Sequence, residues 1–214
     1  MPLNSEPYTG WGRVLTGTGG RARPEKSASL ARILAETPGP ALGALRSYGD
    51  AALSIAPAVD MSRMDRLLSF NAETGVLEAE AGVPLTTLLE VFGPRGWMPA
   101  VIPGTGYATL GGAIAADVHG KNHHGAGSFG QHVLSLQLIG ADGHAREVSP
   151  EMEGDVFHAT LGGMGLTGVI ESATIQLSPC PSMLVDVRER RIPNLSAYME
   201  AFEQSDATFS VGWI

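Results

Sequence analysis

The sequence predicts a globular protein that mixes short helices with short strands. Of its 214 residues, 43% are hydrophobic, which is enough to bury a core. The apolar segments are short and are separated by turn residues. The 28 Gly and 14 Pro residues add many positions where the chain turns or passes close to another group. A glycine-rich chain without repeats suggests a ligand held by backbone.

The first half reads as a helix, a strand and a group of neighbouring strands. The helix is expected to end at Pro38, because proline cannot continue the hydrogen-bond ladder. The turn residues 71–75 suggest a hairpin between two of the strands. Pro84 suits the first turn of a second helix, which Gly93-Pro94 closes. The expected elements are helix Ser27–Glu36, strands Ala41–Tyr48, Ala58–Met61, Arg66–Phe70 and Val76–Ala81, and a helix through Leu85, Leu88, Leu89 and Phe92.

The second half is expected to continue with strands, two helices and a boundary. Asp142-Gly143 reads as a turn between two strands, and Ser178-Pro179-Cys180-Pro181 is the best candidate for a domain boundary. The expected elements are strands Val133–Gly140 and His144–Val148, helix Asp155–Leu161, strand Val169–Leu177, strand Met183–Arg190, helix Leu195–Phe202 and strand Phe209–Trp213.

Charge, leader and cysteine content exclude several classes of protein. The net charge of -8 and the lack of a basic run argue against nucleic acid as a partner. Neither a basic leader followed by an apolar stretch nor a run of about eighteen apolar residues occurs, which predicts a cytoplasmic protein without a membrane span. Cys180 is the only cysteine, so an internal disulfide and a cysteine-based zinc cluster are excluded.

Two segments match the dinucleotide pattern G-x-G-x-x-G, namely residues 125–130 and 163–168. The pattern indicates a Rossmann site only where a strand precedes the glycines and a helix follows. Here a polar loop or a helix precedes each segment and strand-like sequence follows it. We therefore do not predict a Rossmann site.

The histidines of one glycine-rich segment raise the question of a metal site. His119 and His123 are four residues apart and His124 is adjacent, but glycines bracket the group and no third ligand is obvious elsewhere. The alternative, loop histidines that bond to backbone, leaves the surrounding glycines unexplained.

Two loops together suggest a binding site for a phosphate-containing ligand. Residues 42–50 lie where a strand passes into a loop, so that N–H groups, a serine hydroxyl and Arg46 can converge on an anion. Pro103-Gly104-Thr105 and residues 109–116 supply a second glycine-lined turn and the start of a small-residue helix. A long cofactor lying between them would explain the small side chains. Ordinary packed turns would give the same pattern.

Several segments together resemble the decaprenylphosphoryl-ribose 2-oxidase branch of the vanillyl-alcohol-oxidase-type flavoproteins. The segments that carry the resemblance, between about Gly10 and Leu177, are Trp11-Gly12-Arg13, Arg46-Ser47-Tyr48-Gly49-Asp50, Pro103-Gly104-Thr105, Gly111-Gly112-Ala113-Ile114-Ala115, His119-Gly120-Lys121-Asn122-His123-His124, the glycine-rich segment 125–130 and Gly165-Leu166-Thr167-Gly168. The string H-G-K-N-H-H is specific to this branch.

The resemblance implies an α+β, PCMH-type FAD-binding domain of two subdomains in residues 1–179, with FAD between the subdomains. Residues 180–214 would begin a substrate (cap) domain that is incomplete. Tyr48 and His119 would lie nearest the isoalloxazine and are the candidate catalytic residues. The implied FAD contacts are Ala41, Leu42, Gly43, Ala44, Leu45, Arg46, Ser47, Tyr48, Gly49, Asp50, Ala51, Gly104, Thr109, Leu110, Gly111, Gly112, His119, Gly120, Lys121, Asn122 and Ile170.

The implied activity is oxidation of a sugar hydroxyl to a ketone by hydride transfer to the flavin, on a polyprenyl-phosphate-linked pentose of the cell-wall arabinan type. An alditol or sugar-lactone oxidase and an FAD-binding remnant without catalysis remain alternatives. The resemblance implies a short-chain keto-reductase as a partner, and peripheral membrane contact through the substrate. It also places an active-site lysine beyond residue 214, so the 214-residue chain alone is expected to be inactive.

Two neighbouring residues affect how FAD is expected to bind: Arg46 bears on its attachment, and Leu45 departs from the family pattern. Related sugar-lactone oxidases bond FAD covalently to a histidine at the position of Arg46. Arginine has no comparable nucleophilic nitrogen at neutral pH, so FAD is expected to be non-covalent. The family usually has glycine at the position of Leu45, where a branched side chain is expected to crowd the cofactor loop.

Overall fold

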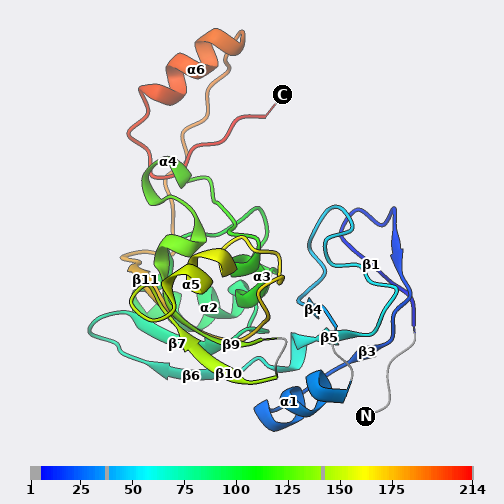
Figure 1. The fold of residues 1–214 in the computed structure, drawn as a ribbon. Helices are drawn as coiled ribbons and strands as arrows, with labels where there is room; N and C mark the ends of the chain where they lie inside the picture. Colours follow the sequence, from blue (N-terminus) through cyan, green and yellow to red (C-terminus); the bar gives the residue numbers. More distant parts are fainter. Residues whose placement is uncertain (1–5, 37–38, 141–142, 214) are drawn as a thin grey trace.

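The computed structural model describes residues 6–36, 39–140 and 143–213 (Figure 1). Its largest element is a six-stranded antiparallel sheet in the order β10-β9-β11-β7-β6, with β8 pairing with β11 beside this path. The strands are β6 Leu67–Phe70, β7 Val76–Glu80, β8 Trp97–Pro99, β9 Val133–Ile139, β10 Ala145–Val148 and β11 Val169–Pro179.

Strand β11 is the centre of this sheet because three strands pair with it. Ala173 faces both Ala79 of β7 and Leu136 of β9, while the last residues of β11 pair with β8. All three of these side chains are buried. The hairpin predicted at residues 71–75 is confirmed, since the N–H of Asn71 donates to the carbonyl of Val76 at 2.9 Å.

The helices of this part pack on the sheet. Helix α3 contacts β7 and β11, α5 contacts β10, and α2 contacts β8. The predicted helices at 85–92 and 155–161 are confirmed, and the second begins one residue earlier than expected. The bounds are α2 Leu85–Phe92, α3 Leu110–Ala115, α4 His123–Ala126 and α5 Gly154–Thr160, with short 3₁₀ helices η2 Gly93–Arg95 and η3 Phe129–His132.

A smaller N-terminal part lies beside the large sheet (Figure 1). It contains a parallel sheet in the order β3-β5-β4 and an antiparallel pair β1-β2. Val59 and Met61 belong to the same buried core as residues of the large sheet, so the two parts share one core. The elements are β1 Tyr8–Thr9, β2 Thr16–Gly17, β3 Arg21–Ala22, the predicted helix α1 Ser27–Glu36, β4 Ala41–Leu42, β5 Ala58–Asp60 and the 3₁₀ helix η1 Met61–Arg63.

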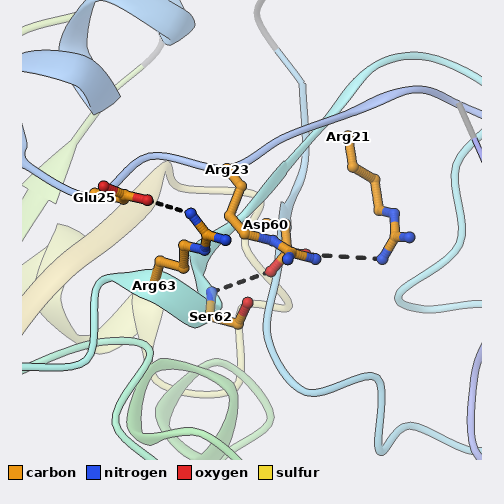
Figure 2. A network of polar contacts seen from close by, with 6 residues as sticks. All are labelled: Arg21, Arg23, Glu25, Asp60, Ser62 and Arg63. Carbon is orange, nitrogen blue, oxygen red and sulfur yellow. Dashed lines mark hydrogen bonds and ion pairs between the residues drawn. The ribbon is translucent and has the colours of Figure 1, made fainter. Parts of the chain in front are cut away.

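A polar network joins β3 to the end of β5 (Figure 2). Asp60 is buried, with 4% of its surface exposed, and its Oδ2 accepts hydrogen bonds from Arg23 Nε at 2.9 Å and Arg23 Nη2 at 2.6 Å. Its Oδ1 accepts from the N–H of Ser62 at 3.1 Å, which caps η1. Arg21 Nη1 lies 3.7 Å from the same carboxylate. The network therefore fixes the position of the backbone at the end of β5, just before Met61.

The predicted strand Ala41–Tyr48 is wrong beyond its first two residues. Strand β4 ends at Leu42, and an irregular loop follows. The physical reason is the backbone of Leu45, which has a φ of 55°, in the left-handed region that no strand contains. The apolar run predicted burial correctly at Leu42 but could not predict this turn.

The predicted strands Met183–Arg190 and Phe209–Trp213 are also wrong. Neither segment pairs with a strand within the described residues, and a strand needs a neighbour to satisfy its backbone groups. The helix between them is confirmed as α6 Leu195–Glu203, which stands away from the two sheets (Figure 1). The turn at Asp142 and the helix stop at Pro38 lie outside the described residues.

Candidate functional site

A narrow channel of about 70 Å³ runs between the small parallel sheet and the start of α3. Small residues and glycines form most of its walls, which leaves backbone at the surface of the channel. Its lining residues are Ala41, Leu42, Gly43, Met61, Ala81, Thr109, Gly111, Gly112, Ala115, Met164, Gly165, Gly168 and Ile170.

Local folding brings the two predicted cofactor loops together at this channel. The side chain of Thr109 caps α3 by accepting from the N–H of Gly112 at 3.2 Å. Gly43 passes so close to Thr109 that a Cβ at residue 43 would collide with the Thr109 hydroxyl. The N–H of Gly111 donates to the carbonyl of Ala81 at 2.8 Å, which holds α3 on the end of β7. Backbone of both loops thus faces a common space.

The loop that follows β4 carries a run of backbone donors, and its first residue, Gly43, lines the channel. Within the described part of the chain, the N–H groups of residues 44–51 donate no hydrogen bond. Successive free N–H groups in a turn create a concave surface of positive potential that suits a phosphate or pyrophosphate. The loop has the donors that a phosphate-containing cofactor requires.

Leu45 packs away from the channel, and its expected effect on a bound cofactor stays a prediction. Its left-handed backbone turns its side chain onto a small cluster formed by Tyr8, Leu42 and Ala58. It is also not among the residues that line the channel. Leucine here anchors the loop, whereas a glycine would supply only the turn.

The N-terminal segment and a loop before α3 flank Arg46. The N–H of Trp11 donates to the carbonyl of Ser47 at 2.9 Å, which lays the N-terminal segment along the cofactor loop. The guanidinium of Arg46 lies 5.6 Å from the ring centre of Trp11 and 5.6 Å from that of Tyr107. Cation–π contacts at this range are individually weak, but the two rings restrict where the Arg46 side chain can point.

A second, wider cleft of about 430 Å³ lies between the H-G-K-N-H-H segment and the C-terminal part of the chain. It shares no lining residue with the channel. Its walls combine basic side chains on one side with apolar ones on the other. The lining residues are Gly104, His119, Gly120, Lys121, His123, Tyr198, Met199, Phe202, Ser210, Val211 and Gly212.

The H-G-K-N-H-H segment is an arm closed at its base. The N–H of Phe129 donates to the carbonyl of Val118 at 2.8 Å, and the N–H of Gly130 donates to Asp117 Oδ1 at 2.7 Å. His119 and Ser128 form an antiparallel bridge just above these bonds. The arm therefore leaves and rejoins the core at one point, and its side chains His119, Lys121 and His123 line the wider cleft.

The histidines of this arm lie near one another without forming a metal site. The ring centres of His119 and His123 are 5.5 Å apart, and those of His123 and His124 are 5.9 Å apart. His123 Nδ1 lies 3.2 Å from the carbonyl of Gly120. In the described ranges of the chain, no three His, Cys, Asp or Glu side chains gather in a way that could hold a metal ion.

The structure brings together some of the predicted FAD contacts and separates others. Seven line the channel, namely Ala41, Leu42, Gly43, Thr109, Gly111, Gly112 and Ile170, and four line the wider cleft, namely Gly104, His119, Gly120 and Lys121. Leu110 and Asn122 are instead buried, and the side-chain Nδ2 of Asn122 donates to the carbonyl of Ala100 at 2.8 Å. Tyr48 is 82% exposed on the outer loop. The FAD contacts themselves stay predictions.

Sequence reasoning missed five residues of the channel wall. They are Met61, Ala81, Met164, Gly165 and Gly168. Three of them belong to the segment 163–168, which matched the dinucleotide pattern and failed the Rossmann context. The signal that remained was the glycine spacing itself, because Gly165 and Gly168 have φ values of 80° and 142° that only glycine adopts freely.

These features define a flavoprotein of the FAD-binding class, since residues 20–149 match the FAD binding domain family and the chain belongs to it. The residues present suit such a cofactor, because glycines and small side chains form most of the channel wall and the loop that leaves the channel at Gly43 carries unpaired N–H groups. FAD is the cofactor of this protein. No helix in the part of the chain that the structure describes is long and apolar enough to cross a membrane.

Comparison with curated proteins narrows the class. The chain is 41% identical over 188 residues to decaprenylphosphoryl-beta-D-ribose oxidase of Mycolicibacterium smegmatis, an alignment that covers 84% of this chain and 41% of that protein. It is 29% identical over 172 residues to mouse L-gulonolactone oxidase, with 76% and 38% covered. It is 35% identical over 99 residues to cytokinin dehydrogenase 9 of rice, with 46% and 18% covered. The chain thus spans less than half the length of these relatives.

Proposed function

We propose that this chain is the FAD-binding part of an oxidoreductase that oxidises a sugar hydroxyl to a ketone, with a polyprenyl-phosphate-linked pentose as substrate. The observation that carries the proposal is the channel with its glycine-rich wall, and the 41% identity to the ribose oxidase over 188 residues supports it. The name of that relative gives the substrate class. The division at residue 179, a cell-wall role and a short-chain keto-reductase as partner belong to the same proposal.

The residues of this chain bind and orient the cofactor in this proposal. The N–H groups of residues 44–51 hold the pyrophosphate, and Gly111 and Gly112 let the backbone approach it. Bound FAD supplies the acceptor for the hydride that leaves the sugar carbon, while the hydroxyl proton leaves to a base. His119 and Lys121 line the wider cleft. Tyr48 and His119 are assigned to the isoalloxazine end of the site.

Similarity to a sugar-lactone oxidase supports a second candidate. Mouse L-gulonolactone oxidase aligns with 76% of this chain at 29% identity. A lactone oxidase and a lipid-linked sugar oxidase would share the channel and differ in what enters the wider cleft. The apolar wall formed by Met199, Phe202 and Val211 favours a substrate with a hydrocarbon part over a small polar lactone.

Anaerobic reduction of the bound flavin separates these candidates. The full-length protein is mixed with a polyprenylphosphoryl ribose or with L-gulono-1,4-lactone, and the flavin absorbance is followed. We expect the lipid-linked sugar alone to bleach it. Bleaching by the lactone alone would establish the second candidate. Bound FAD that neither compound reduces would contradict both and leave a binding module without this catalysis.

A further inference from the structure

The turn between α5 and β11 forms one wall of the channel. Two hydrogen bonds tie it to the end of α3: the N–H of Gly162 donates to Ile114 at 3.0 Å, and the N–H of Met164 donates to Ala115 at 2.8 Å. The N–H of Leu166 closes the turn onto Gly163 at 2.9 Å. The turn is therefore held at a fixed distance from α3, with Met164 at its edge.

Met164 has a backbone conformation that disfavours its side chain. Its φ is 51°, between Gly162 at 76° and Gly165 at 80°. Glycine adopts this region freely, whereas an unbranched side chain with a Cβ raises the free energy of the turn. Non-glycine residues persist in such conformations where the surroundings or a function require them.

The side chain of Met164 gains little from packing in return. It is 49% exposed, so it does not belong to the core. It lines the channel together with Leu42, Gly43 and the start of α3. A flexible thioether in this place can adapt its shape to a ligand and makes favourable contacts with aromatic rings. A methionine at a position suited to glycine thus points to a ligand in the channel.

We propose that Met164 is a retaining residue for FAD, whose side chain covers the part of the dinucleotide that crosses the channel and slows its release. The inference rests on the channel being the path of the cofactor. The tie between Met164 and Ala115 keeps the thioether over the channel, and the glycines on either side allow the turn to carry it.

The rate of FAD release from the purified protein tests this role. Met164→Ala removes the thioether but keeps a residue with a Cβ at this left-handed position. Met152→Ala is a matched control, because Met152 is 53% exposed on a turn that does not line the channel. Release is followed by the recovery of flavin fluorescence after dilution. We expect release at least about fivefold faster from Met164→Ala, and unchanged release from Met152→Ala.

Met164→Gly separates retention from folding. Glycine relieves the backbone at residue 164, so we expect a higher unfolding temperature without FAD together with faster release. A purely structural role would give higher stability with unchanged or slower release, and that result would overturn the proposal.

Gly112→Ala narrows the same channel by one methyl group. It separates the claim that FAD lies in the channel from the claim that Met164 retains it. Weakened FAD binding in this variant with unchanged release from both Met164 variants would overturn the role of Met164 and leave the cofactor path intact. Unchanged binding in all three variants would overturn the path as well.

Discussion

Asp60 accepts two hydrogen bonds from the guanidinium of Arg23, at 2.9 and 2.6 Å, and thereby connects β3 to the end of β5 (Figure 2). The next residue, Met61, lines the channel. Burial by itself raises the pKa of Asp60, but the hydrogen bonds from Ser62 and Arg23 and the charge of Arg23 outweigh burial. The pKa of Asp60 is therefore below its usual value, and the carboxylate is charged in the folded protein at neutral pH.

Asp60→Asn is expected to lower the free energy of unfolding by about 2 kcal/mol at pH 7, because it leaves Arg23 without its charged partner. Urea unfolding followed by circular dichroism measures the change. Glu25→Gln is the matched control, since Glu25 pairs with Arg63 in the same network but both side chains are exposed. We expect a change within about 0.5 kcal/mol there. Equal losses in both variants would contradict the role given to burial.

The contribution of Asp60 should depend on pH in one direction. Because the pKa of Asp60 is lower in the folded than in the unfolded chain, its stabilisation is complete above the unfolded value and is lost as the pH falls through the folded value. The difference in unfolding free energy between the wild type and Asp60→Asn should be constant from pH 7 down to about pH 5 and shrink below the ordinary value of 3.8. A difference that persists unchanged at pH 3, or shrinks above pH 5, would count against the assignment.

Gly111→Val is expected to reduce bound FAD far more than Cys180→Ser does. A Cβ at residue 111 would lie 2.8 Å from the Cβ of Ala81 and 3.2 Å from its carbonyl oxygen, so valine pushes α3 away from β7 and adds bulk to the channel. Overpacking of this kind also costs roughly 1–3 kcal/mol of stability. Cys180 is buried outside the channel, where its thiol contacts the carbonyl of Ser182 at 3.3 Å. Flavin absorbance per protein measures the result, and equal flavin in both variants would contradict the site.

The sequence predicted the regular elements well and the site geometry only in part. Periodicity located α1, α2, α6 and the strands of the large sheet because their apolar faces are repeated locally. It failed at residues 43–48, because the left-handed backbone of Leu45 sets the course of the chain there. No sequence pattern predicts that conformation. It also failed at 183–190 and 209–213, because strand pairing depends on a neighbour rather than on the segment itself.

The channel illustrates the same limit. The glycines at 43, 111 and 112 were predicted to let the backbone approach a ligand, and the structure brings them to one space. Met164 was not recognisable, since methionine predicts nothing at that position until its backbone angle is known. Contacts between segments about fifty residues apart, such as Ala115 with Met164, are set by tertiary packing.

FAD is expected to be released intact by acid precipitation of the protein. The resemblance places Arg46 where covalently bonded relatives have histidine, and a guanidinium offers no comparable nucleophilic nitrogen. Yellow supernatant, identified as FAD by its chromatographic retention and mass, is the expected result. Flavin that stays in the washed pellet would show a covalent bond and overturn the prediction.

Gly104→Val is expected to weaken FAD binding at least about tenfold, equivalent to roughly 1.4 kcal/mol, without lowering stability. Gly104 lines the wider cleft, no protein atom lies within 4 Å of a Cβ built there, and its φ is not in the left-handed region. The protein alone therefore does not require glycine at this position, whereas a flavin in the cleft would collide with the branched side chain. Gly125→Val is the matched control, because Gly125 has the same open surroundings and lines neither cavity. Titration of apoprotein with FAD measures both affinities, and thermal unfolding without FAD measures stability. Equal affinities in the two variants would mean that the cofactor does not reach this cleft.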